Sequence, residues 1–133
     1  KSEPNCETDG SSSNESWSLR AWWEENRELS ERFYREVLGM EGDAPRTCEP
    51  WICRRIVDMH LRSPAMLAIL PLQDWLATDA ALRSPHADRE RINIPAAPRY
   101  YWRYRMHLTL EELLRQEPFN ATLREMIIAG GRR

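Results

Sequence analysis

The sequence predicts a mainly α-helical protein with one or two short strands. Apolar residues recur at the helical period from Trp17 onward, and Thr109 with Glu112 forms the pattern of a capping box. An apolar run at 65–70 has the length of a buried strand. The chain has 133 residues, 41% hydrophobic and 30% charged, which suits one domain or part of one.

Composition excludes several classes of function. The net charge is −2, from 19 basic and 21 acidic residues, so no overall field attracts a polyanion. No apolar run approaches the roughly 20 residues that span a bilayer, and the first residues lack the apolar centre of a secretory signal. We therefore expect neither a nucleic-acid partner nor a membrane.

The cysteines and histidines do not form a metal or redox motif. Cys48 and Cys53 are spaced for neither a Cys-x-x-Cys motif nor a usual zinc site, and Cys6 lies far from both. His60 and His107 lack the second ligands that would complete a metal site. We expect free thiols, structural histidines, no metal and a cytoplasmic location.

The N-terminal part combines a leader with a long helix. Residues 1–16 contain no aliphatic or aromatic side chain, which predicts a disordered leader, and a first residue other than Met suggests excision from a longer chain. The helix should begin at Trp17 and stop near Gly39 to Gly42. Because neighbouring helical residues face different ways, one of Trp22 and Trp23 should lie in the core while the other covers a neighbouring element.

The middle of the chain alternates helices with irregular segments. Pro50 should begin a second helix that ends at Ser63 and Pro64. The run at 65–77 indicates a buried strand that passes Pro71 into a short helix. Prolines and charges at 83–99 indicate an extended surface loop.

Two helices should close the chain. Thr109 caps the first, and the second starts near Pro118 and ends at Gly130 and Gly131, where glycine can adopt the left-handed cap. Its predicted buried residues are Leu123, Met126 and Ile127.

The stretch YYWRYRMHLTLEELL, at 100–114, concentrates rings and cationic side chains before a helix. Rings and guanidiniums could bind nucleic acid, flat rings could cover a sugar, or the rings could line a core wall. For Trp102, Arg103, Tyr104 and Arg105 we favour packing and ion pairing over direct substrate contact.

The chain resembles the C-terminal end of the 4-α-glucanotransferases, also called amylomaltases or disproportionating enzymes, especially the branch with the plant cytosolic form. The resemblance covers most of the chain from Trp17 onward. It rests on LRAWWEENRE, SPAMLAILPLQDWLA, ERINIPAAPRYYWRYRMHLTLEELL and the closing helix.

This resemblance implies a (β/α)₈ barrel that transfers α-1,4-glucan segments between maltooligosaccharides or glucans with retention and without a cofactor. Because a barrel takes about 250 residues, 17–133 would be its C-terminal part. The family's nucleophile and acid/base lie upstream of the matched region. The isolated segment should therefore be inactive, and its apolar faces should promote self-association. The alternative is a non-catalytic helical module for interaction or glucan binding.

The resemblance also suggests site residues. Counting back from Leu19 places Asn14 and Glu15 where the family has a His and its third catalytic Asp; Glu15 keeps the charge but adds a methylene. Two pairs of substrate-binding candidates follow, namely Gln73 with Asp74 and Arg91 with Asn93.

Each of these pairs has a simpler interpretation. Gln73 and Asp74 follow the predicted strand, where barrel enzymes place their sites, although Asp74 could equally cap the short helix. By resemblance, Arg91 and Asn93 order a loop beside the glucan groove. Alternatively, they are a solvated arginine and a turn asparagine.

Overall fold

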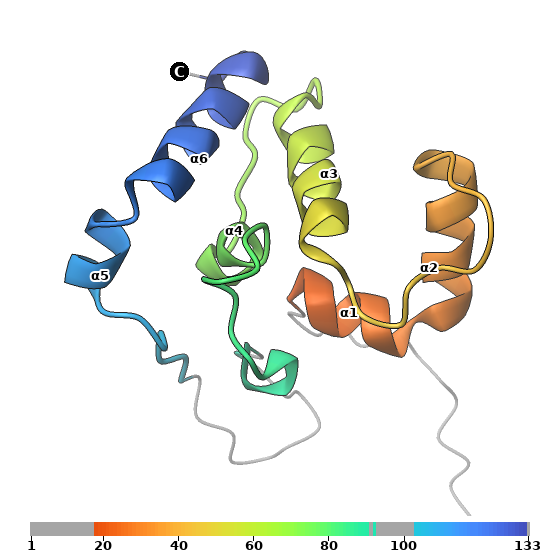
Figure 1. Ribbon diagram of the computed structural model, residues 1–133. Helices are drawn as coiled ribbons and strands as arrows, with labels where there is room; N and C mark the ends of the chain where they lie inside the picture. Colours follow the sequence, from red (N-terminus) through yellow and green to blue (C-terminus); the bar gives the residue numbers. More distant parts are fainter. Residues whose placement is uncertain (1–17, 91, 93–102, 133) are drawn as a thin grey trace, which may run out of the picture.

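The computed structural model describes residues 18–90, 92 and 103–132. Its regular elements are all helical, in the order α1 (Leu19–Glu25), α2 (Arg27–Arg32), a π-helical turn η1 (Phe33–Val37), α3 (Pro50–Leu61), α4 (Leu72–Leu76), a 3-10 turn η2 (Ala87–Glu90), α5 (Leu110–Leu114) and α6 (Glu117–Ala129). Helix α3 stands in the middle, with α2 to one side, α4 and α6 to the other, and α1 below its lower end (Figure 1). The mainly α-helical prediction is confirmed.

The predicted strand at 65–70 is wrong, and the described residues contain no strand. This segment is irregular and solvent-facing: Met66 is 92% exposed, Leu67 71% and Ile69 87%. A strand requires a neighbouring strand to pair its backbone, and the described part of the chain provides none. The run therefore remains an apolar surface.

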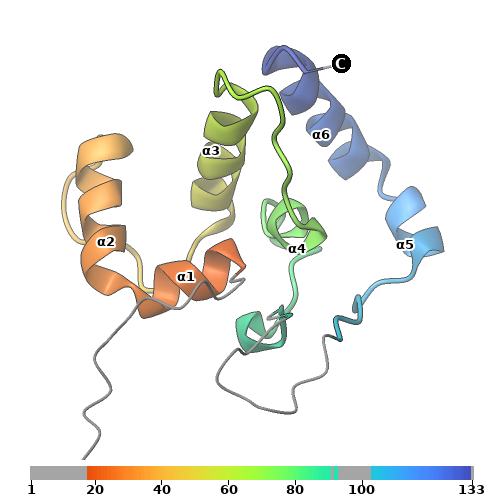
Figure 2. The same ribbon diagram turned by 180° about the vertical axis from the view of Figure 1, so that it is seen from behind.

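The predicted N-terminal helix bends at Asn26, whose backbone is not helical (φ −105°, ψ 62°). The Asn26 side-chain amide donates to the Trp22 carbonyl at 2.9 Å, and the Ser30 hydroxyl donates to the Trp23 carbonyl at 2.8 Å. The Trp22 carbonyl also keeps its backbone bond from the Asn26 N–H at 3.0 Å, whereas at the Trp23 carbonyl the Ser30 hydroxyl takes the place of a backbone donor. As a result α1 and α2 run in clearly different directions (Figure 2).

The end of this helical region follows the sequence prediction. In η1 the Leu38 N–H donates to the Phe33 carbonyl at 3.0 Å, an i to i+5 bond that widens the last turn. Gly39 then adopts a positive φ of 66°, which ends the helix at the predicted position.

A first core cluster lies between α1, η1 and α3. It consists of buried side chains: Trp23, Tyr34, Ala44, Cys48, Ile52, Cys53, Ile56 and Ala77. Trp23 is fully buried and its indole donates to the Pro45 carbonyl at 2.9 Å, whereas Trp22 is half-buried and packs against the cluster. The different roles predicted for the two tryptophans are confirmed. Cys48 and Cys53 are free thiols as expected, while Cys6 lies outside the described residues.

A second, smaller cluster joins α4 to the two closing helices. Leu76, Leu82 and Phe119 form its buried centre. The capping box is confirmed, because the Thr109 hydroxyl accepts from the Glu112 N–H at 3.1 Å and the Glu112 carboxylate accepts from the Thr109 N–H at 2.7 Å. The residues predicted to be buried on α6, namely Leu123, Met126 and Ile127, are half-buried.

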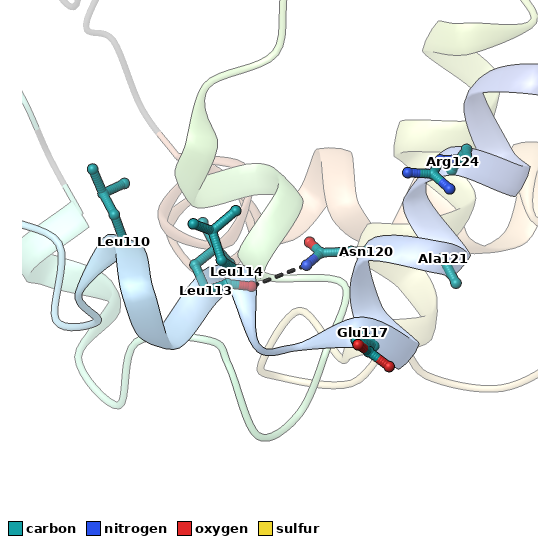
Figure 3. Close-up of a pocket in the computed structure, with 7 residues that line it drawn as sticks. All are labelled: Leu110, Leu113, Leu114, Glu117, Asn120, Ala121 and Arg124. Atoms are coloured by element: carbon teal, nitrogen blue, oxygen red, sulfur yellow. Dashed lines mark hydrogen bonds between the residues drawn. The ribbon is translucent and has the colours of Figure 1, made fainter.

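A shallow groove is lined by residues of α5 and α6 (Figure 3). The leucines Leu110, Leu113 and Leu114 line it from α5. At the junction of the two helices, the Asn120 amide donates to the Leu113 carbonyl at 3.0 Å.

Arg132 fastens the end of α6 to the end of α3. Its guanidinium donates to the carbonyls of Leu61 at 2.8 Å, Ser63 at 2.8 Å and Ala65 at 2.6 Å. The helices approach closely here, since a Cβ added to Gly130 would lie 2.8 Å from the Leu61 Cβ. The predicted glycine end is confirmed by Gly131, with φ 73°.

Two further predictions concern segments that the structure describes in part or not at all. The predicted leader at 1–16 lies outside the described residues. The predicted extended loop at 83–99 is wrong where it is described, because it contains η2 and buries Glu90, which is 2% exposed. Among the described residues, no helix is long and apolar enough to cross a membrane.

We predict that Arg132→Ala lowers the free energy of unfolding by about 1–2 kcal/mol, because several charge-assisted hydrogen bonds are lost together. Urea unfolding of the chain measures this. Arg124→Ala, at an exposed position of α6, is the matched control and should change stability by less than about 0.5 kcal/mol. Equal effects of the two substitutions would contradict the role of Arg132.

Candidate functional site

Five polar residues from distant parts of the chain meet where α1, α4 and η2 come together. They are Arg20, Gln73, Asp74, Ser84 and Glu90, here called the polar cluster, and all five are buried. Burying so many polar groups is costly unless they pair with one another. The polar cluster is therefore stable only if these side chains form hydrogen bonds and ion pairs in the folded chain.

Asp74, on α4, forms a hydrogen bond with the first residue of α1. Its Oδ1 accepts from the Leu19 backbone N–H at 2.8 Å, and the Ser18 hydroxyl accepts from the Ala21 N–H at 3.3 Å. Together they satisfy donors that the start of a helix leaves unpaired. Asp74 lies inside α4, and Pro71 occupies the N-cap of that helix, so Asp74 caps α1 rather than its own helix.

Burial raises the pKa of the Asp74 carboxyl to about 6. The hydrogen bond from Leu19 opposes this rise, and the negative charge of Glu90 adds to it. Asp74 consequently changes charge near neutral pH while its side chain is only 6% exposed.

Arg20 and Glu90 form the ion pair at the centre of the polar cluster. One guanidinium nitrogen of Arg20, Nη1, donates to Glu90 Oε1 at 3.0 Å and to the Ser84 carbonyl at 2.6 Å. Burial raises the pKa of Glu90, and the charge of Arg20 opposes that rise. Within the described part of the chain, Arg20 Nε and Glu90 Oε2 are buried without a hydrogen-bond partner.

Gln73 completes the cluster through the backbone of η2. Its amide donates to the Glu90 carbonyl at 3.3 Å, so α4 binds both the start of α1 and the end of η2. The structure thus brings the predicted site residues Gln73 and Asp74 together. Both are buried, and both are hydrogen-bonded to the chain itself.

The remaining predicted site residues, Glu15, Arg91 and Asn93, lie outside the described residues. Their neighbours in the sequence, however, belong to the polar cluster or contact it. Glu90 directly precedes Arg91, and Leu19, which Asp74 binds, follows Glu15 by four positions. The cluster therefore anchors the chain close in sequence to each of these residues.

Sequence reasoning missed Arg20 and Glu90. For Arg20 a signal was present, because it precedes the core residue Trp23 by one helical turn and so shares its buried face. Glu90 carries no comparable signal, since its partner is 70 residues away.

The two histidines considered as metal ligands both bind backbone carbonyls. A ring nitrogen of His60 lies 2.8 Å from the Ile56 carbonyl, and one of His107 lies 2.8 Å from the Leu82 carbonyl. Among the described residues, no group of three or more potential metal ligands comes together.

The geometry suits a scaffold rather than an open reaction centre. Arg20 and Glu90 pair with each other, Asp74 binds a backbone N–H, and all three side chains are buried. A substrate would reach them only after movement of a neighbouring segment. The polar cluster can fix the positions of backbone segments through hydrogen bonds. Because the pKa values of the Asp74 and Glu90 carboxyls are raised, the strength of these interactions should depend on pH.

The chain belongs to the 4-alpha-glucanotransferase family, whose model matches residues 11–110. It is similar to 4-alpha-glucanotransferase DPE2 of Oryza sativa subsp. japonica, with 42% identity over 115 residues. That match covers 86% of the chain and 12% of the relative's own length. No solved structure matches the chain significantly.

We predict that the Asp74→Asn variant becomes more stable relative to the native chain as the pH rises from 4 to 7. The folded-state pKa of Asp74 is raised to about 6, so the stability linked to its protonated form is present at low pH and is lost as the pH rises through that value. Asparagine keeps an oxygen for the Leu19 N–H and never ionises.

Urea unfolding of both proteins at several pH values tests this. The difference in unfolding free energy should change by up to about 3 kcal/mol in favour of the variant, because the pKa of Asp74 rises to about 6 on folding. A difference that stays constant with pH would show that Asp74 titrates normally.

Proposed function

We propose that this chain is part of an enzyme that transfers α-1,4-glucan segments between maltooligosaccharides or glucans with retention. The observation that supports this most is the family match over residues 11–110. The chain spans 12% of the length of its rice relative, so the activity belongs to a longer polypeptide of which this region would be one part. In this proposal the region derives from the end of a (β/α)₈ barrel and works without a cofactor.

The described region would act by holding backbone segments in position. Retaining transfer needs a nucleophile and an acid/base, which the family places outside this region. Asp74 holds the start of α1, and Gln73 with Arg20 holds η2. Glu15, Arg91 and Asn93 follow or precede these anchored points and are proposed to face the glucan, with Glu15 in the register of the third carboxylate.

The exposed run at 65–70 also supports a place within a larger protein. Met66, Leu67 and Ile69 present apolar side chains to solvent, which a folded chain normally covers. We propose that this run is covered in the longer polypeptide and promotes self-association when the chain is alone. The free Cys48 and Cys53 thiols support a cytoplasmic location.

A second candidate is a non-catalytic module that binds glucan or another polypeptide. The closed state of the polar cluster favours it, because no described carboxylate in the cluster is open to a substrate. The two candidates differ in what the longer polypeptide does.

We predict that the full-length polypeptide disproportionates maltotriose into glucose and longer oligosaccharides, while residues 1–133 alone do not. Product analysis by chromatography measures both. Activity of residues 1–133 alone would contradict the location of the nucleophile and acid/base. A correctly folded but inactive full-length polypeptide would instead favour the non-catalytic module.

We further predict that Ile69→Lys reduces self-association of the isolated chain, because it places a charge in the exposed apolar run. Sedimentation measures the mass distribution. Val37→Lys, at a position 48% exposed on η1 and outside this run, is the control and should leave association unchanged. If the isolated chain without substitutions is monomeric, the proposed self-association is wrong.

A further inference from the structure

A basic pocket lies between η2 and the segment at 103–107. Its volume is about 470 Å³, within the range of small-ligand sites. The lining residues are Ser84, Pro85, His86, Arg89, Arg103, Tyr104, Arg105 and His107. The pocket is separate from the buried interior of the polar cluster, with which it shares Ser84.

Most of the lining residues have basic or hydrogen-bonding side chains. The lining combines three guanidiniums with two imidazoles and contains no carboxylate among its described residues. Neither Arg89 nor Arg105 forms an ion pair with another described residue. Because the chain as a whole has a net charge of −2, this concentration of positive charge is local.

Among the described residues, neither Asp88 nor Glu90 forms an ion pair with Arg89 or Arg105. Glu90 is already paired with Arg20 at 3.0 Å, and Asp88 is exposed on η2 and does not line the pocket. Burial raises the pKa of the Tyr104 phenol, and the charge of Glu90 adds to the rise. Tyr104 therefore keeps its proton and can donate a hydrogen bond to an anion.

The histidine at the other side of the pocket has a defined tautomer. His107 Nε2 lies 2.8 Å from the Leu82 carbonyl, which can only accept, so Nε2 carries the proton. This hydrogen bond anchors the His107 ring beside the pocket.

We propose that this pocket binds a phosphate monoester. Guanidiniums match the oxygens of a phosphate in a two-pronged geometry, and several of them around one cavity suit a doubly charged group better than a carboxylate. The volume exceeds what inorganic phosphate fills, which leaves room for a sugar-sized group on the ester oxygen. The proposal does not depend on transferase activity, and a neutral glucan chain would not need these charges.

Isothermal titration calorimetry of the full-length polypeptide tests this proposal, with inorganic phosphate and glucose 6-phosphate as probes at constant ionic strength. We expect saturable binding of glucose 6-phosphate that Arg105→Gln and Arg89→Gln each weaken by about tenfold or more, since each removes a charge-assisted hydrogen bond. Arg105→Lys keeps the positive charge but removes the planar guanidinium that can donate two hydrogen bonds to one phosphate. This variant should therefore bind glucose 6-phosphate more weakly than the native protein.

Arg54→Gln is the matched control, because Arg54 is exposed on α3 and forms no ion pair with a described residue. It should change affinity by less than about twofold. Tighter binding of glucose 6-phosphate than of inorganic phosphate identifies a sugar ester as the ligand class, and equal binding identifies the phosphate group alone. Absence of saturable binding, or an equal loss in Arg54→Gln, would overturn the proposal.

Discussion

The buried pair of Arg20 and Glu90 is the interaction on which the rest of this structure depends. It joins α1 to η2 across 70 positions of the sequence. Removing two charges from water costs several kcal/mol per ion, so such a pair persists only where further hydrogen bonds support it. The Ser84 carbonyl supplies one, and the Gln73 amide fixes the backbone of Glu90 itself. The pair therefore requires α1, α4 and η2 to be in place together.

This requirement explains why the two predicted site residues of α4 are buried. Asp74 and Gln73 bind backbone groups at Leu19 and Glu90, next to the two segments where the other predicted site residues lie in the sequence. A glucanotransferase site built from separate segments needs such fixed points, because a small displacement of a catalytic group is costly to the reaction. In the proposed function, the polar cluster would supply these fixed points.

Local signals in the sequence predicted local structure well. Pro50 at the start of α3, the capping box of Thr109 and Glu112, and the glycine end at Gly131 all depend on a few neighbouring residues. At the bend near Asn26, the Ser30 hydroxyl takes the place of a backbone donor at the Trp23 carbonyl, and the run at 65–70 lacks a pairing strand among the described residues. The pair of Arg20 and Glu90 has no local signature, so only three-dimensional structure reveals it.

A double-mutant cycle on Arg20→Met and Glu90→Gln tests the central role of this pair most directly, with the free energy of unfolding as the measured quantity. Each single substitution leaves a buried partner unpaired and should cost about 3 kcal/mol or more, whereas the double substitution should cost clearly less than their sum. Effects that add to within about 0.5 kcal/mol would show that the two side chains act independently and would contradict this account.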